Sequence, residues 1–469
     1  MPDLEKPNER GLFGGVFGRG GVEVGDTAWL QAMLDTEAGL ARALERAGLT
    51  PAGSGAAVTA AAQAKNFDPN ELGGFAALTG NPVPGLARAL ARLVPPAAAG
   101  VVHRGATSQD ILDTAAMLLA KRAIAVIDAD LARVAGAAAG LADAHRTSIM
   151  IGRTLLQQAV PVTFGLIAAG WLTSLDEARD GLAGVVSQRL AVQFGGAAGT
   201  LASLGDAGPR VALLLAEELG LALPVLPWHT DRLRIIDLGT VLARVAAALG
   251  KIARDVTLLA QSEVGEVSEG SGTEQRGPEQ QGSAAPRRGG SSAMPHKRNP
   301  VAAIALLGCT RQVPGLLATL AAAAEQELQR AAGAWHAEWE PLTALLRLTG
   351  SASSWGAELL PGLAVDTSRM AANLAATKGL PLAEHVASLL AGVLGGAQAH
   401  DLVAQASARA VGAGLPLSDV LMAVPKLEER LTAAGITTEQ IDSALDPAGY
   451  LGSADAFITA ALGAHQSRR

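Results

Sequence analysis

Residues 287–303, RRGGSSAMPHKRNPVAA, combine a glycine pair, a serine pair and a lysine in one short segment. Ser291 directly follows the two glycines, and Lys297 comes six residues later. Because glycine adopts backbone conformations that other residues avoid, we expect Ser291 to move on a hinge. A serine hydroxyl has little acidity in water, but an ammonium group and backbone N–H groups in a closed, dry site stabilise its alkoxide. The segment therefore predicts proton transfer beside a carboxylate, with Ser291 as acid or base and Lys297 as the neutralising charge.

A second polar cluster, HRGATSQDILDTA, occupies residues 103–115 and leads into a long apolar pattern. Thr107, Ser108 and Asp110 are residue types that cap helix N-termini, and capping alone explains any one of them. Thr107, Ser108 and Gln109 place three hydroxyl or amide side chains in a row, which is more than a cap needs. Together with the free N–H groups and the positive end of a helix, they favour a binding site for a carboxylate. His103, just upstream, is either a proton donor or a hydrogen-bonded loop histidine.

A third cluster, GRTLLQQAVPVTFG at residues 152–165, contains Arg153, Thr154 and Gln157. Proline commonly occupies the first position of a helix, so we expect the next helix to begin at Pro161. Thr154 and Gln157 are three residues apart and would share one face of a helical turn. Arg153 either binds substrate or forms a surface ion pair, which is the commoner environment of arginine.

The composition favours packed helices and a small anionic ligand. Of the 469 residues, 49% are hydrophobic but only 3% aromatic, and alanine and leucine dominate. That balance favours helices over sheets. The formal net charge of −7 argues against nucleic acid, which requires a broad basic face. A polyanionic small molecule remains compatible if a few cations converge locally, and Arg153, Arg298 and Arg330 are candidates for that role.

Other features exclude several classes of site and of location. The single cysteine, Cys309, allows no internal disulfide and suits a reducing cytoplasm. The polar N-terminus does not resemble a signal peptide, and no charge-free segment of about twenty apolar residues predicts a membrane span. The sequence has no nucleotide-binding glycine motif, no serine elbow and no closely spaced zinc-binding histidines. We therefore expect a cytoplasmic enzyme that uses no cofactor or metal and binds no membrane.

Helical periodicity is clearest between residues 232 and 267. Apolar residues recur there at alternating spacings of four and three, which places one apolar stripe along a helix of roughly 50 Å. The stripe consists of Leu238, Leu242, Val245, Leu249, Ile252, Val256 and Leu259. Small apolar residues beside it give the helix more than one apolar face, so it requires several neighbours. We expect it to belong to a bundle that forms the core of an oligomer.

The interval 266–300 is a polar, glycine-rich loop that ends in the serine and lysine segment. Long loops within compact domains are usually functional or disordered, so we expect this one to act as a lid. Changes in the helical pattern predict three helical domains, at residues 1–105, 106–348 and 349–469.

Together, the three polar clusters resemble the signature regions of one enzyme superfamily. GSSAMPHKRNP is similar to the signature loop of the fumarase, aspartase and argininosuccinate lyase superfamily, and TSQDILDT and GRTLLQQAVP resemble its other two regions. The resemblance implies an all-α fold whose central domain is a long helix bundle within the twenty-helix core of a homotetramer. It also implies that three subunits assemble each active site and that Ser291 is the catalytic serine.

These interpretations define the expected site. The catalytic candidates are Ser291 and His103. The substrate-binding candidates have hydroxyl, amide or cationic side chains: Thr107, Ser108, Gln109, Arg153, Thr154, Gln157, Lys297, Arg298 and Asn299.

Two apolar positions help to decide which branch of the superfamily the chain resembles. Adenylosuccinate lyases carry a histidine where this chain has Leu155 and its glutamate partner where this chain has Ile304. The loss of both groups disfavours C–N cleavage that requires a protonated leaving group. PWHTDRLRI and WHAEWEPL instead resemble the bacterial cycloisomerases of the superfamily, although Leu155 and Gln158 replace tryptophan and histidine of some members, which affects substrate fit.

In the cycloisomerase reaction, a carboxylate of the substrate adds across a double bond of the same molecule and closes a lactone. That nucleophile is already ionised at neutral pH, so only a proton for carbon must be supplied. The resemblance therefore implies a cycloisomerase that acts on a carboxymuconate. The alternatives are a fumarate-releasing enzyme of the adenylosuccinate lyase type and a lyase-fold protein with a structural or binding role, which the intact Ser291, Lys297 and Asn299 disfavour.

Overall fold

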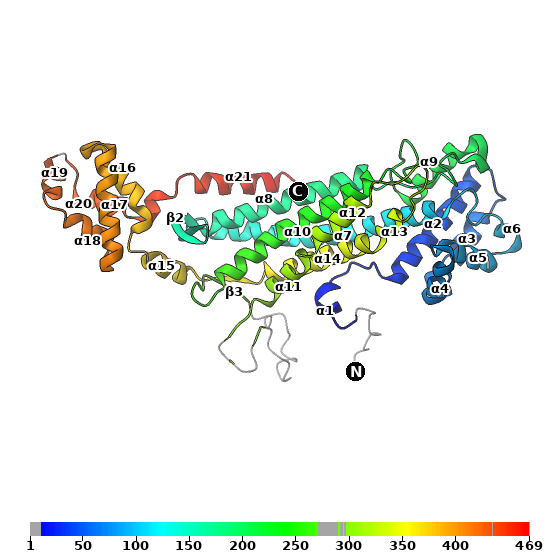
Figure 1. Ribbon diagram of the computed structural model, residues 1–469, viewed down its shortest axis with the longest axis horizontal. Coiled ribbons are helices and arrows are strands. Elements are labelled where there is room, and N and C mark those ends of the chain that lie inside the picture. The colour runs from blue at the N-terminus through cyan, green and yellow to red at the C-terminus, as the bar shows by residue number, and fades with distance from the viewer. Residues whose placement is uncertain (1–10, 271–288, 291–293, 295–296, 434, 469) are drawn as a thin grey trace. The chain divides into compact units, whose positions relative to one another are not determined.

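The computed structural model describes residues 11–270, 289, 290, 294, 297–433 and 435–468. Helices make up most of this part of the chain, and its strands form two two-stranded sheets (Figure 1). The expected all-α fold is confirmed.

The chain forms two compact units, each built from three separated segments. Unit 1 comprises Met1–Ala132, Glu177–Ala253 and Ala302–Glu358, and unit 2 comprises Arg133–Asp176, Arg254–Val301 and Leu359–Arg469. The domain boundaries expected near residues 105 and 348 both fall within unit 1, so the three-domain division stays a prediction.

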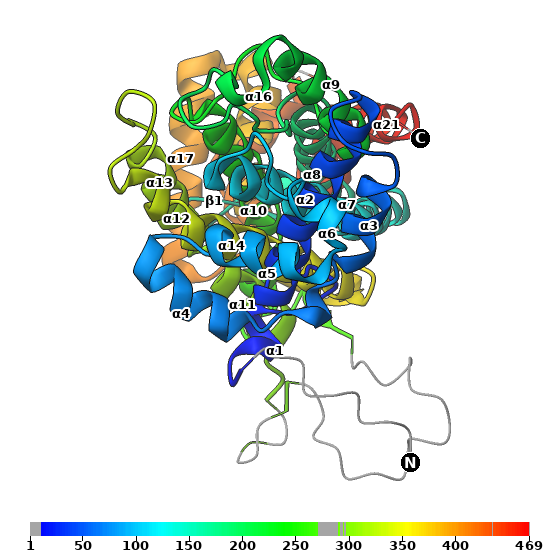
Figure 2. The same ribbon diagram turned by 90° about the vertical axis from the view of Figure 1, so that its right-hand side faces the viewer.

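Helix α2 (Asp26–Arg46) is the central element of the N-terminal part of unit 1 and packs against α3 and α9 (Figure 2). Most of its residues from Leu30 to Leu44 are buried. Leu30, Leu34, Glu37 and Leu44 share one face at helical spacing, so one charged side chain lies on an otherwise apolar face. The other short helices of this unit are α1 (Gly14–Phe17), α3 (Ser54–Ala61), α4 (Pro69–Thr79), α5 (Val83–Leu93), α6 (Pro96–Ala99), α9 (Gly208–Leu219), α11 (Val301–Thr310), α12 (Val313–Ala322) and α13 (Ala334–Ala337).

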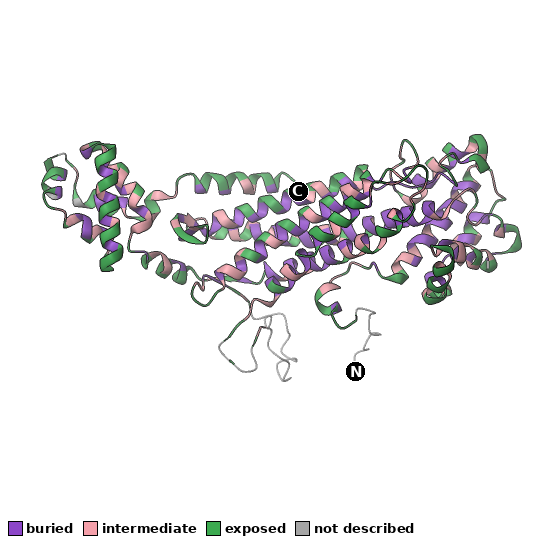
Figure 3. Cartoon of the chain, viewed as in Figure 1, coloured by how far each residue is buried: buried purple, intermediate pink, exposed green. Residues whose placement is uncertain are grey.

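The remaining long helices are α7 (Ser108–Ala144), α8 (Phe164–Gln188), α10 (Leu233–Leu259) and α14 (Trp339–Leu359). All seven residues of the predicted stripe lie on α10 and are at most 7% exposed, so the predicted buried face is confirmed (Figure 3). The helix is shorter than the interval 232–267, because it ends at Leu259 and strand β3 (Val267–Glu269) follows.

Unit 2 contains a hairpin, a second small sheet and a C-terminal group of helices. Strand β3 pairs antiparallel with β4 (Leu363–Val365), and α15 (Thr367–Ala375) packs against β1. Helices α16 (Ala383–Leu394) and α17 (Gly396–Ala413) pack together on an apolar core that α18 (Leu417–Met422), α19 (Leu427–Ala433) and α20 (Thr438–Ala444) complete, and α21 (Ala454–Gln466) follows.

The expected helix start at Pro161 is wrong. Residues 149–163 form an antiparallel hairpin of β1 (Ile149–Thr154) and β2 (Gln157–Thr163), in which Pro161 pairs with Ile151. Helix α8 begins three residues later, at Phe164. Proline is tolerated in a two-stranded sheet because each strand has a free edge, where no donor is needed.

Residues 301–322 are the one stretch of the described chain whose length and composition would suit a membrane span. The stretch contains Arg311 and consists of two helices, α11 and α12, which are separated by Arg311 and Gln312.

Candidate active site

Asp110, in the first turn of α7, organises the segment that precedes the helix. One carboxylate oxygen accepts hydrogen bonds from the backbone of Thr107 (3.0 Å) and Gly196 (2.9 Å). The other accepts from the backbone of Gly195 (3.0 Å) and lies 2.6 Å from His229 Nε2. Asp110 is 1% exposed. Besides its contact at the start of α7, it therefore joins two other chain segments, at Gly195–Gly196 and at His229, in the protein interior.

Thr107 and Ser108, which were expected to bind a carboxylate, lie half-buried at the N-terminus of α7. Within the described part of the chain, neither hydroxyl has a hydrogen-bond partner. Both hydroxyls are therefore available to a ligand at the positive end of a 37-residue helix.

Gln109 points the other way and is buried. Its amide nitrogen donates to the Asp113 carboxylate (3.1 Å) and to the His229 carbonyl (2.8 Å), while its oxygen accepts from Arg330 (3.0 Å). Arg330 also donates to the Gly196 carbonyl (2.7 Å). These contacts do not support substrate binding by Gln109, because both of its polar atoms are bonded to protein; for Arg330 they indicate a structural role.

His103 is paired with Glu37 of α2. The Nδ1 atom of His103 lies 2.7 Å from one carboxylate oxygen, and its backbone N–H donates to the other at 2.9 Å. Burial lowers the pKa of the imidazole, but the hydrogen bond to Glu37 and the charges of Glu37 and Asp110 outweigh it, so the pKa of His103 is raised. The raised pKa favours the imidazolium, which suits an anionic ligand.

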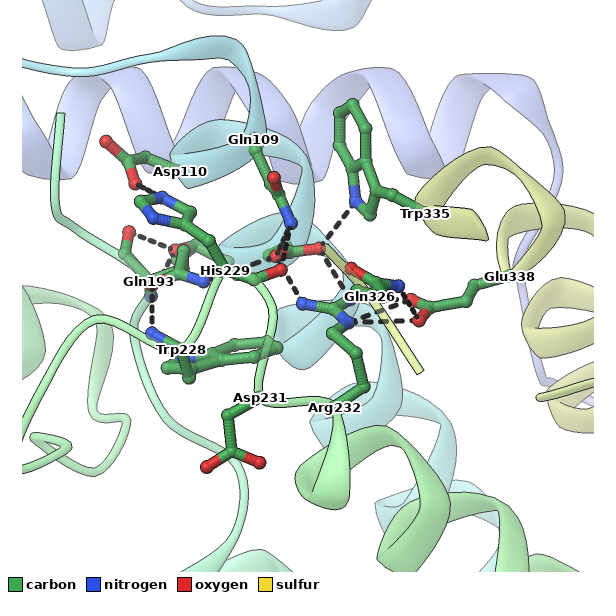
Figure 4. Close-up of polar contacts among 12 residues, drawn as sticks. Gln109, Asp110, Gln193, Trp228, His229, Asp231, Arg232, Gln326, Trp335 and Glu338 are labelled. Atoms are coloured by element: carbon green, nitrogen blue, oxygen red, sulfur yellow. Dashed lines mark hydrogen bonds and ion pairs between the residues drawn. The ribbon is translucent and has the colours of Figure 1, made fainter. Parts of the chain in front are cut away.

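A buried ionic network behind Gln109 was missed from the sequence (Figure 4). Arg232 donates to Asp113 (2.7 and 3.0 Å) and to Glu338 (2.6 to 3.2 Å). Trp335 donates to Asp113 (3.0 Å), and Gln326 donates to Glu338 (2.9 Å). Burial lowers the pKa of the Arg232 guanidinium, but Asp113 and Glu338 raise it by more than burial lowers it. The pKa is therefore raised overall, and Arg232 stays charged.

The two carboxylate partners of Arg232, Glu338 and Asp113, lie 106 and 119 residues from it, so no local spacing could reveal them. The available signal was the concentration of aromatic and charged residues in PWHTDRLRI and WHAEWEPL, stretches that contribute Arg232, Trp335 and Glu338. Buried ionic groups must be paired, so charged residues amid apolar patterns predict partners elsewhere in the chain.

The second cluster of expected site residues lies in unit 2, at the tip of the β1–β2 hairpin. Thr154 and Gln157 are paired at the ends of the strands, so the turn between them is a hairpin turn, and the shared face that a helical turn would give does not form. Leu155 and Leu156 form the turn with positive φ values of 50° and 64°, as a type I′ turn requires. All four residues are exposed.

Arg153 forms a bidentate ion pair with Glu266, which is 0% exposed, with both N···O distances at 2.8 Å. Asn373 also donates to Glu266 (2.8 Å). Of the two alternatives for Arg153, the structure therefore matches the ion pair, although the pair is largely buried and not at the surface. Glu266 directly precedes β3, so the pair ties the hairpin to the start of the glycine-rich loop.

The end of that loop is held together at Gly289 and Asn299. The Gly289 carbonyl accepts from the backbone (2.9 Å) and the side chain (3.2 Å) of Asn299, and Gly290 forms a β-bridge with Arg298. Gly289 has a φ of 74°, and a Cβ there would lie 2.5 Å from the Asn299 carbonyl oxygen, so this position requires glycine. The expected hinge for Ser291 stays a prediction. Lys297 and Arg298 are exposed and precede α11.

Ser291 lies outside the described residues, as do Ser292, Ala293, Pro295 and His296. Among the residues that the structure describes, no group of three or more histidine, cysteine or acidic side chains could hold a metal ion. A cavity of about 660 Å³ in unit 2, lined in part by Thr147, Thr367 and Pro447, contains none of the expected site residues.

Family models and individual relatives both match this chain to lyases. Residues 86–315 match the family model described as Lyase, and residues 379–461 match Adenylosuccinate lyase C-terminus. Nitrosuccinate lyase from Streptomyces davaonensis is 46% identical, covering 98% of this chain and 96% of its own. The 3-carboxy-cis,cis-muconate cycloisomerase from Pseudomonas aeruginosa is 45% identical over 94% of this chain and 93% of its own.

A solved structure agrees with these relatives. The 3-carboxy-cis,cis-muconate lactonizing enzyme from Pseudomonas putida superimposes with a TM-score of 0.87 at 41% identity, covering 97% of this chain and 99% of its own. The chain therefore belongs to the fumarase, aspartase and argininosuccinate lyase superfamily, within the group that contains the bacterial 3-carboxy-cis,cis-muconate cycloisomerases.

Proposed function

We propose that the protein is a 3-carboxy-cis,cis-muconate cycloisomerase of the β-ketoadipate pathway of protocatechuate degradation. The main support is the similarity over nearly the whole chain to several cycloisomerases, 43–45% identical in three bacterial species. The signature residues Ser291, Lys297 and Asn299 are all present in the sequence.

The reaction adds one carboxylate of the substrate to a carbon of a double bond. A C–O bond forms, the π electrons move to the neighbouring carbon, and that carbon accepts one proton. The carboxylate beside this carbon carries the extra negative charge until the proton arrives. Ser291 is the proposed proton donor, and Lys297 is proposed to stabilise the transient charge.

The polar residues at the start of α7 are suited to binding the carboxylates that do not react. Thr107 and Ser108 offer hydroxyls that have no hydrogen-bond partner among the described residues, and His103 offers an imidazole with a raised pKa. A carboxylate here would accept charge-assisted hydrogen bonds next to the positive helix end.

Nitrosuccinate elimination is a second candidate, because the nitrosuccinate lyase relative is as similar to the chain as the cycloisomerases. Both reactions move a proton on a carbon beside a carboxylate. Neither requires a general acid for the other group, since nitrite leaves as a stable anion and the attacking carboxylate is already ionised. The apolar Leu155 and Ile304 are therefore compatible with both reactions and disfavour an amine leaving group.

A substrate panel separates the candidates. Purified protein is mixed with 3-carboxy-cis,cis-muconate, nitrosuccinate, adenylosuccinate and argininosuccinate. Loss of diene absorbance with formation of 4-carboxymuconolactone supports the cycloisomerase. Nitrite release without lactone would replace it with the nitrosuccinate reaction, and fumarate from a succinyl-amine would replace both.

We also propose a cytoplasmic homotetramer with active sites shared between subunits, without nucleic acid or membrane as a partner. Several apolar side chains of the described surface, including Leu155, Val225 and Leu328, are at least 85% exposed, as expected for surfaces covered in an assembly. Light scattering coupled to size-exclusion chromatography would give the subunit number directly, and a monomeric, fully active protein would contradict the shared site.

A further inference from the structure

Glu37 is a buried carboxylate that contacts one histidine at two points. Its side chain is 0% exposed on the inner face of α2, and its two oxygens contact the backbone N–H and the ring Nδ1 of His103. A buried carboxylate is costly unless it is paired and hydrogen-bonded. This contact therefore accounts for a charge on an otherwise apolar helix face.

The backbone of His103 is in the left-handed region, with φ at 60°. Residues other than glycine rarely adopt this conformation, and it persists only where surrounding contacts impose it. The hydrogen bond from the His103 N–H to Glu37 is such a contact. Glu37 therefore holds both the strained backbone and the ring of His103 in place.

The same contact determines which ring nitrogen is available. A carboxylate accepts hydrogen bonds, so Nδ1 of His103 carries a proton. Within the described part of the chain, Nε2 has no hydrogen-bond partner, and the side chain is 24% exposed. The charged groups that act on the ring are Glu37 of α2 and Asp110 of α7, both of which favour the imidazolium.

We infer that Glu37 is a positioning residue for the reaction: it accepts a hydrogen bond from Nδ1–H and fixes the orientation of His103, so that the Nε2–H of the imidazolium donates to a carboxylate of the substrate. This inference rests on the proposed function only for the polycarboxylate nature of the substrate. It assigns to Glu37 a role that acts through His103, without contact with the substrate.

The test combines NMR of ¹⁵N-histidine-labelled protein with steady-state kinetics. His103→Asn assigns the resonances of His103. In the parent protein, the neutral form of His103 should carry its proton on Nδ1. Tricarballylate, a saturated tricarboxylate that cannot react, should then shift the Nε2 resonance. The opposite tautomer, or an Nε2 signal that does not respond, would overturn the inference without any variant.

Glu37→Gln has the same shape but loses the charge. It should lower the pKa of His103 and raise KM about tenfold or more at neutral pH, with a smaller change in kcat, because one charge-assisted hydrogen bond is weakened. The alkaline limb of kcat/KM should move to lower pH. Glu45→Gln, which removes a carboxylate that binds the backbone of Gly53 and Gly55 from the same helix, is the matched control and should change none of these.

Kinetics are measured with whichever substrate of the panel the parent protein converts, so failure of the cycloisomerase proposal leaves this test intact. A folded Glu37→Gln protein with an unchanged His103 titration would overturn the inference. A shifted titration with unchanged KM and pH profile would overturn it as well, because the pair would then be structural only.

Discussion

Asp110 and His229, 119 residues apart in the chain, are joined by a 2.6 Å hydrogen bond in the interior of unit 1. Through its other contacts, Asp110 also binds the backbone at Gly195 and Gly196. The position of the α7 N-terminus, where Thr107 offers its hydroxyl, therefore depends on a histidine outside the signature regions.

Replacement of His229 tests this dependence. His229→Ala removes one of the four described donors to Asp110 and should lower the free energy of unfolding by about 1–3 kcal/mol, because a buried carboxylate loses one charge-assisted hydrogen bond. It should also raise KM. His229→Gln retains a donor and should lie between the parent and the alanine variant in both urea denaturation and KM. Equal effects of the two variants would show that the hydrogen bond is not the cause.

The buried pairing of Asp113 with Arg232 should contribute far more to stability than an exposed pair. Among the described residues, Asp113→Ala leaves the buried Arg232 charge with one counter-ion, Glu338, and we expect it to lower the free energy of unfolding by about 3–5 kcal/mol. Glu217→Ala breaks an exposed ion pair with Arg46 and should have little effect in the same urea titration. Similar losses for both variants would contradict the importance assigned to burial.

The raised pKa of His103 predicts a pH-dependent contribution to stability. Because the folded state binds this proton more tightly, the contribution is fully present below the pKa of an unfolded histidine and is lost as pH rises through the folded pKa. The difference in free energy of unfolding between the parent and Glu37→Gln should therefore be larger at pH ~6, where His103 is protonated, than at pH ~9, where it has lost the proton. Denaturation at the two pH values measures it, and a constant difference would be inconsistent with the linkage.

The hairpin tip provides a test of backbone strain. Leu155 and Leu156 both have positive φ, which asparagine and glycine adopt more readily. Leu155→Asn with Leu156→Gly should raise the free energy of unfolding by about 1 kcal/mol. We expect turnover to fall, because the substituted residues lie between Thr154 and Gln157, the two substrate-binding candidates of the hairpin. Val160→Gly, on strand β2 of the same hairpin, should instead be destabilising, and a loss of stability in the double variant would contradict the strain argument.

The parts of the fold that the sequence predicted are those determined by local pattern. The buried stripe of α10 follows from the alternating spacing of its apolar residues, and the requirement for glycine at position 289 follows from its residue type. The hairpin was missed because leucines occupy its turn instead of Asn-Gly, and because Pro161 also suits a helix start.

The polar contacts of the site could be predicted only in part. Thr107 and Ser108 were found because they precede a helix and need no distant partner to be recognised. Glu37 is 66 residues from His103, and Arg232 is 119 residues from Asp113, so neither pairing leaves a spacing signal in a single sequence. Gln109 was assigned to the substrate because two of its partners, the His229 carbonyl and Arg330, lie 120 and 221 residues away and leave no local signal.

The central chemical claim is that the hydroxyl of Ser291 exchanges a proton with the carbon skeleton of the substrate. Ser291→Ala can be compared with Ser292→Ala, which removes the adjacent hydroxyl, by measuring kcat on 3-carboxy-cis,cis-muconate and the affinity for tricarballylate. The account predicts that Ser291→Ala lowers kcat by about 10² or more while affinity changes little, and that Ser292→Ala retains most activity. A Ser291→Ala protein with the kcat of the parent would contradict it.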